Sequence, residues 1–171
     1  MIYDPIIELP VFLAYSLEME RESAERLREF SDIMRAHNQQ SLAEAFEQLA
    51  TYSDKHAREI SQICKGKNLP TIPAWAFEWP EDQPPETAHY EDISYLMSTR
   101  DALEAMLEQE QASAAFYADV ADRTPNDEIK YFAREFAEEE REHARALMLW
   151  LEKFPPNPPS PVDIDPPRTI D

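Results

Sequence analysis

Residues 132–149 read FAREFAEEEREHARALML, and this stretch indicates how the rest of the chain is built. Glu140 and His143 stand three residues apart, so on a helix they share one face. Apolar residues continue that face on both sides: Phe132, Phe136, Leu147 and Trp150. A charge buried among such residues is costly unless it is paired or binds a metal. Helical bundles build dimetal sites from two inward-facing Glu-x-x-His pairs and two further glutamates, so the other parts should lie on other helices.

Composition narrows the fold class and the partners. The 171 residues suffice for one domain with a real core, and 43 % of them are apolar. One Gly argues against a sheet with tight turns, whereas long Ala/Leu/Glu/Arg segments favour an all-α fold. A net charge of −19 argues against nucleic acid as a partner, because phosphate binding needs a basic face. The acidic residues indicate solvated helix faces, or a field that concentrates cations.

The single cysteine and the lack of long apolar runs bear on location. Cys64 has no intrachain partner, so the chain contains neither a disulfide nor a Cys₄ metal centre. The N-terminus resembles no signal peptide, and no apolar run reaches the roughly 18 residues of a spanning helix. We therefore expect a soluble cytoplasmic protein that does not bind membranes.

Four helices are predicted within a domain of residues 1–154. Their ranges are about 11–36, 41–65, 98–123 and 125–153. Gly66 suits the end of the second helix, and Asp101 is placed to help cap the third. Thr124 followed by Pro125 predicts an N-cap and first turn for the fourth.

Two segments lie outside these helices. Residues 67–92 form a long connection that carries Trp75, Phe77 and Trp79. A four-helix bundle whose second and third helices run parallel needs one such crossover, which the aromatic residues would fasten to the bundle. A lid over a ligand is the alternative. Residues 155–171 contain seven prolines and predict an extended tail.

A weak internal repeat relates the two halves of the chain. EMERESA at 18–24 matches EQEQASA at 108–114 in four of seven positions, and LATYSDKHAR at 49–58 matches FAEEEREHAR at 136–145 in four of ten. Each half is thus a helical hairpin with a Glu on its first helix and a His on its second. Two hairpins related by a pseudo-twofold axis would bring five residues to one central point as candidate metal ligands: Glu20, His56, Glu110, Glu140 and His143.

These residues resemble the rubrerythrin-like branch of the ferritin-like superfamily over about residues 11–153. The resemblance implies a ferritin-like four-helix bundle with a non-haem di-iron centre and oxidase, peroxidase or ferroxidase activity. The resemblance also implies a role for each ligand: Glu20 and Glu110 would be terminal carboxylates and Glu140 a bridging carboxylate. His56 and His143 would be the nitrogen ligands. The chain lacks the rubredoxin domain of full-length rubrerythrins, and Ser113 replaces their additional carboxylate.

Ser53 is the main departure from the repeat, because it aligns with Glu140 where a second bridging glutamate is expected. Three carboxylates leave one positive charge of two divalent ions unbalanced. Glu59, one turn beyond His56, is one candidate to fill the position. Asp54 is another, although it points about 100° away. Water or an exogenous anion is the third.

Two hypotheses follow for function. The first is a di-metal oxidoreductase that oxidises Fe(II) with O₂ or peroxide. The second is a non-catalytic ferritin-like protein, with a site that holds one ion or none and a role in structure or partner binding. The ligand types suit two iron ions, but one ion, manganese or zinc stays open. The resemblance implies a homodimer, and the tail is a candidate docking peptide.

Overall fold

Four long helices make up nearly all of the regular structure among the residues that can be described. The computed structural model describes residues 3–80, 85, 98–154 and 156. Its elements are α1 (Leu9–Ala36), α2 (Gln40–Ile63), the short 3₁₀ helix η1 (Ala74–Ala76), α3 (Thr99–Arg123) and α4 (Asp127–Leu151). These residues contain no strand, which confirms the all-α prediction. Apart from Pro156, the predicted tail lies outside the described residues.

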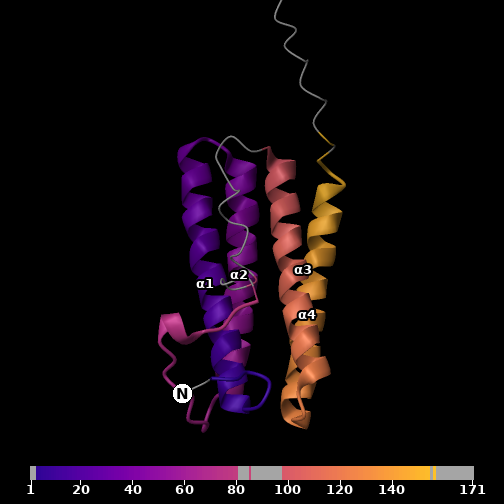
Figure 1. The fold of residues 1–171 in the computed structure, drawn as a ribbon. Coiled ribbons are helices and arrows are strands. Elements are labelled where there is room, and N and C mark those ends of the chain that lie inside the picture. Colours follow the sequence, from indigo (N-terminus) through magenta and orange to yellow (C-terminus); the bar gives the residue numbers. More distant parts are fainter. Residues whose placement is uncertain (1–2, 81–84, 86–97, 155, 157–171) are drawn as a thin grey trace, which may run out of the picture.

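The helices form two antiparallel hairpins, α1 with α2 and α3 with α4 (Figure 1). The closest backbone approach lies within each hairpin, while the two hairpins meet mainly through side chains. Helix α2 ends at the opposite end of the bundle from the start of α3, so these two helices run parallel (Figure 1). The connection therefore has to cover the length of the bundle, as the ferritin-like topology requires.

The turn between α1 and α2 depends on Asn38. This residue has φ 60°, in the left-handed region that asparagine tolerates better than most residues. Its backbone N–H donates to Arg35 O at 3.1 Å, and the N–H of Gln39 donates to Met34 O at 2.9 Å. The paired bonds satisfy carbonyls that the end of a helix leaves free. The chain can therefore reverse within a few residues.

The predicted caps of the second hairpin are correct for α3 and wrong for α4. Ser98 and Asp101 form a reciprocal capping box at the start of α3, which confirms the prediction. The N-cap of α4 is Asn126 rather than Thr124, because the Asn126 side chain accepts from two backbone N–H groups of the first turn. Thr124 instead ends α3, and its hydroxyl donates to Ile6 O at 2.6 Å.

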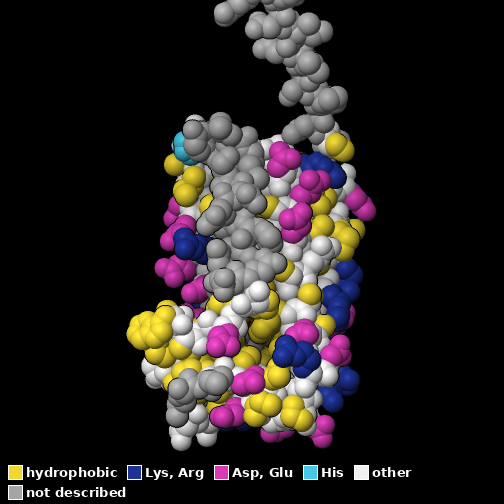
Figure 2. Space-filling model, in the orientation of Figure 1, with side chains coloured by type: hydrophobic (Ala, Val, Ile, Leu, Met, Phe, Trp, Pro, Cys, Tyr) yellow, Lys and Arg dark blue, Asp and Glu magenta, His cyan; other side chains and the backbone are white. Residues whose placement is uncertain are grey.

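Aromatic packing fastens the described part of the crossover to the bundle. The Tyr15 ring on α1 lies 4.8 Å from Phe77 and 4.9 Å from Trp79. The Tyr15 hydroxyl also accepts a hydrogen bond from the backbone N–H of Glu78 at 2.8 Å. Trp75 in η1 does not take part, because its side chain is 88 % exposed. Figure 2 shows hydrophobic atoms projecting on the side of the bundle where η1 lies in Figure 1. Two of the three crossover aromatics thus pack as expected.

A polar layer separates two apolar parts of the core. One cluster joins the first half of α1 and the C-terminal half of α2 to the C-terminal half of α3 and the first half of α4, with Phe12, Tyr117 and Phe136 at its centre. The other occupies the opposite end of the bundle, around Leu42 and Leu103. Buried polar side chains lie between them in the chain: Glu20, Ser23, Ser53, His56, Gln109, Ser113 and Glu140. All four α-helices contribute to this layer, so a ligand bound there would meet polar side chains from each of them.

Among the described residues, no helix combines the length and apolar character that crossing a membrane requires.

Candidate metal centre

The structure brings all five predicted residues together in the polar layer. Glu20 comes from α1, His56 from α2, Glu110 from α3, and Glu140 and His143 from α4. Their ligand atoms form two groups, each compact enough to hold one metal ion. The first contains Glu20, His56 and Glu140, and the second contains Glu110, Glu140 and His143. Each group combines an acid and an imidazole from one hairpin, and Glu140 belongs to both.

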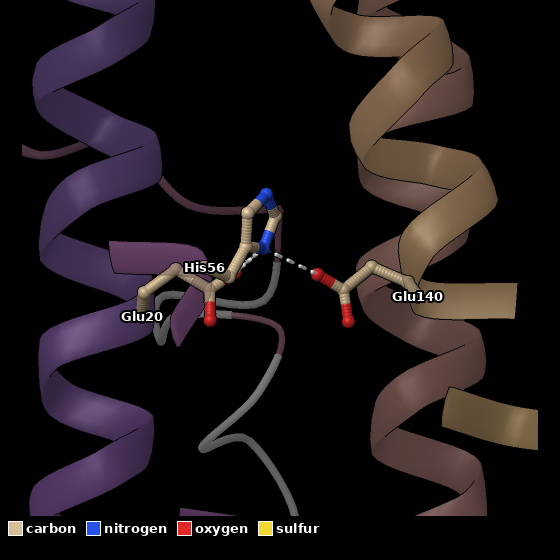
Figure 3. A group of neighbouring side chains, drawn as sticks. All are labelled: Glu20, His56 and Glu140. Atoms are coloured by element: carbon tan, nitrogen blue, oxygen red, sulfur yellow. Dashed lines mark ion pairs between the residues drawn. The ribbon is translucent and has the colours of Figure 1, made fainter. Parts of the chain in front are cut away.

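In the first group, one ring nitrogen of His56 faces two carboxylates. Nδ1 lies 2.7 Å from Oε1 of Glu20 and 3.3 Å from Oε1 of Glu140. Figure 3 shows the two acids reaching this nitrogen from opposite sides, Glu20 from α1 and Glu140 from α4. All three side chains are at most 2 % exposed. The group is therefore enclosed by protein.

The second group is arranged similarly but lies nearer the surface. Nδ1 of His143 is 3.3 Å from Oε2 of Glu110 and 3.4 Å from Oε2 of Glu140. The side chain of His143 is 20 % exposed and that of Glu110 is 13 % exposed. The ring of Tyr52 stacks on His143 with centroids 5.2 Å apart. Two ions in these groups would therefore occupy unequal environments.

The protonation behaviour of this cluster reflects buried acids at close range. Burial raises the pKa of Glu110 to about 8. Burial also opposes ionisation of Glu140, yet the nearby imidazoles of His143 and His56 and the Glu110 carboxyl hold its pKa well below the usual range. Burial disfavours the charged form of His143, but the carboxylates of Glu110 and Glu140 raise its pKa to about 11. A divalent cation would replace these retained protons as the balancing charge.

Several buried polar atoms in this layer lack hydrogen bonds within the described part of the chain. They include Oε2 of Glu110, Oε1 of Glu140, Oγ of Ser113 and Nε2 of Gln109. Buried polar groups are nearly always satisfied, so each exception asks for an explanation. Metal coordination would account for the two carboxylate oxygens, because oxygen and imidazole nitrogen ligands suit iron, manganese or zinc. The residues present therefore fit a pair of such ions.

Neither side chain proposed to replace the missing glutamate is placed to do so. Ser53 is buried and hydrogen-bonded to Ser23, with their hydroxyl oxygens 3.1 Å apart. Glu59 is about half exposed, with its carboxylate 3.6 Å from Lys55 Nζ, and Asp54 forms an ion pair with Arg28. Both acids thus have partners outside the layer, since their helix positions direct them to the surface.

Sequence reasoning missed Glu139, which is the fourth carboxylate beside the cluster. Its Oε2 lies 3.1 Å from Nε2 of His56, and its side chain is 39 % exposed. Glu139 sits in an acidic run on a helix, where a surface role is the ordinary expectation. The signal available was its position four residues before His143, which places both on neighbouring turns of one face.

Comparisons with known proteins agree with this arrangement. The family model described as Rubrerythrin matches residues 11–151. The crystal structure of an uncharacterized conserved protein from Magnetospirillum magnetotacticum MS-1 is similar, with a TM-score of 0.67 and 34 % sequence identity. That likeness covers 86 % of this chain and 95 % of the other. No curated protein matches the chain.

Proposed function

The chain belongs to the rubrerythrin family, and from this we propose that it binds two divalent metal ions, iron by preference, between its hairpins. The family match confirms the resemblance inferred from the sequence, and together with the Glu/His cluster it supports a metal-binding ferritin-like protein. Our proposal goes further than this in the number of ions, their identity and their chemistry.

One observation carries the proposal: the two oxygens of Glu140 face different imidazoles. Oε1 is 3.3 Å from His56 Nδ1, and Oε2 is 3.4 Å from His143 Nδ1. A carboxylate in this position can bind one ion through each oxygen. Glu20 and His56 would complete the ligands of one ion, and Glu110 and His143 those of the other.

Bound iron would supply redox chemistry, namely oxidation of Fe(II) by O₂ or peroxide. The protein would hold the ions and control access to them. Phe136 packs edge-on against His56 with ring centroids 4.8 Å apart, and Tyr117 packs against Phe136 at 5.4 Å. This aromatic wall excludes water from the first group. The second group, with the partly exposed His143, is the side nearer to solvent.

A second candidate function is metal binding without turnover. The hydrogen bond between Ser53 and Ser23 favours it, because the missing carboxylate is replaced by a satisfied serine pair. Such a site would bind its second ion weakly.

Metal content after anaerobic reconstitution of the metal-free protein with Fe(II) tests both functions. We expect about two ions per chain, as in other di-iron bundles, and loss of both in Glu140→Ala. Glu142→Ala is the matched control, because this acid is exposed on the same helix. About one ion, rising to two in Ser53→Glu, would support the second function. A wild-type iron content no higher than that of Glu140→Ala would overturn both candidate functions.

Reaction with the oxidant then separates turnover from binding. The Fe(II)-loaded protein should consume O₂ or peroxide in proportion to its iron, and Glu140→Ala should not. An iron-loaded protein that is oxidised no faster than free Fe(II) would refute the redox function and leave metal binding intact.

A further inference from the structure

The two ring nitrogens of His56 have different partners. Nδ1 faces Glu20 and Glu140, as Figure 3 shows, while the other nitrogen points away from both acids. That second nitrogen, Nε2, lies 3.1 Å from Oε2 of Glu139. One nitrogen therefore faces the candidate ligand set, and the other faces a carboxylate that belongs to neither group.

We propose that Glu139 is a positioning residue, which accepts a hydrogen bond from Nε2–H of His56 and so keeps the Nδ1 lone pair directed at the metal. This inference rests on the proposed function, since it assumes an ion beside Nδ1. Histidine ligands commonly donate their second N–H to a carboxylate, which fixes the tautomer and makes the ligating nitrogen more basic. Glu139 brings a carboxylate oxygen to 3.1 Å from Nε2, within reach of such a bond.

The packing around the ring shows what Glu139 adds. Phe136 meets the imidazole at an interplanar angle of 82°, which limits the tilt of the ring. Aromatic packing alone does not distinguish a ring from its 180° flip, because both have nearly the same shape. The flip would turn Cδ2 toward Glu20 and Glu140 and Cε1 toward Glu139. Glu20 and Glu140 at Nδ1 and Glu139 at Nε2 therefore favour the same ring orientation, and Glu139 does so from outside the ligand groups.

The internal repeat gives an independent reason to assign a role to this position. Glu139 aligns with Tyr52 when His143 is aligned with His56. Tyr52 contacts the imidazole of the other hairpin too, by stacking on His143 at 5.2 Å. Each hairpin therefore uses the same position to hold the histidine of its partner hairpin. One histidine is held by a charge and the other by an aromatic ring.

Glu139 also addresses the charge deficit left by Ser53. Two divalent ions carry four positive charges, and the three carboxylates of the two groups balance only three of them. Glu139 brings a fourth negative charge against His56 without occupying the layer itself. Because its side chain is 39 % exposed, it remains partly hydrated and avoids the full cost of burial.

The nitrogen that binds metal can be observed directly in the zinc-loaded protein. We expect long-range ¹H–¹⁵N spectra to show His56 bound through Nδ1 and protonated at Nε2. In Glu139→Ala, the Nε2 proton should exchange faster with solvent. Zinc bound through Nε2 of His56 would overturn the proposal, as would an unchanged proton exchange rate.

Zinc affinity, measured by competition with a chelator, gives the second test. Glu139→Ala should weaken one of the two ions by about 10–100-fold, the usual effect of losing such a partner. Glu139→Gln should lose less, because its amide oxygen still accepts the hydrogen bond. Glu142→Gln removes the same charge from an exposed position and should leave both affinities unchanged. If wild type binds two zinc ions and Glu139→Ala binds them with the same affinities as wild type, this inference alone is refuted. If wild type binds no zinc, the proposed function is refuted.

Discussion

Replacing Ser53 with glutamate should affect the metal-free and metal-loaded proteins in opposite ways. Ser53 is buried, bonded to Ser23, and equivalent in the repeat to Glu140. The new carboxylate would enter a layer that already contains Glu20 and Glu140. Without metal it adds a charge of the same sign, and with metal it supplies the missing balance.

The expected magnitudes are large enough to measure. Loss of the Ser23–Ser53 hydrogen bond costs about 1 kcal/mol. Two carboxylates roughly 4 Å apart repel by about 4 kcal/mol at an effective dielectric constant of about 20. The metal-free protein should therefore lose several kcal/mol from a total stability of about 5–15 kcal/mol. The second ion should bind at least about tenfold more tightly, because a ligand matters more than the outer partners whose loss costs about 10–100-fold.

Urea unfolding in EDTA and in saturating Mn(II) or Zn(II) is the assay. Ser53→Ala controls for the lost hydrogen bond and should lower the free energy of unfolding by about 1 kcal/mol in both conditions. Ser31→Glu controls for burying a glutamate, because Ser31 is a buried serine of α1 that bonds Ala43 O, away from the candidate ligands. Equal destabilisation of Ser53→Glu with and without metal would refute the proposal that position 53 lies next to the bound ions.

Three further outcomes are expected. Metal binding near pH 7 should release protons, and metal affinity should rise with pH, because the pKa values of Glu110 (about 8) and His143 (about 11) are raised in the metal-free protein and both groups hold a proton there. Calorimetry in buffers of different ionisation enthalpy measures the protons released, and a binding enthalpy that does not depend on the buffer would contradict the prediction. Tyr15→Phe should destabilise the fold by about 1 kcal/mol in urea, because the Glu78 N–H loses its acceptor; no loss would show that solvent replaces the bond. Burial raises the pKa of the Cys64 thiol, so iodoacetamide should alkylate Cys64 far more slowly in the native than in the unfolded protein. Equal alkylation rates would refute the burial of Cys64.

The repeat was the most informative part of the sequence. It relates Glu20 and His56 to Glu110 and His143, and the structure places these pairs on opposite hairpins around Glu140. Helical periodicity and a repeated acid–imidazole spacing suffice for this, because both depend on local geometry.

Details that depend on tertiary contacts were not predictable in the same way. The contact of Glu139 with His56 crosses between hairpins, whereas its spacing from His143 indicates only a shared helix face and not a contact with another helix. Thr124 and Asn126 are both good N-cap residues, and the choice follows from the contact of Thr124 with the backbone of Ile6. The surface pairing of Asp54 on α2 with Arg28 on α1 likewise required the structure.

The division of the chain into two hairpins has a consequence for folding kinetics. Each hairpin joins helices that are adjacent in sequence, and such local contacts form quickly. The later step brings Glu20 and His56 of one hairpin against Glu140 of the other, and it must remove water from charged groups before they gain partners. Docking of the preformed hairpins should therefore limit the overall rate, and a divalent ion should act on that step rather than on helix formation.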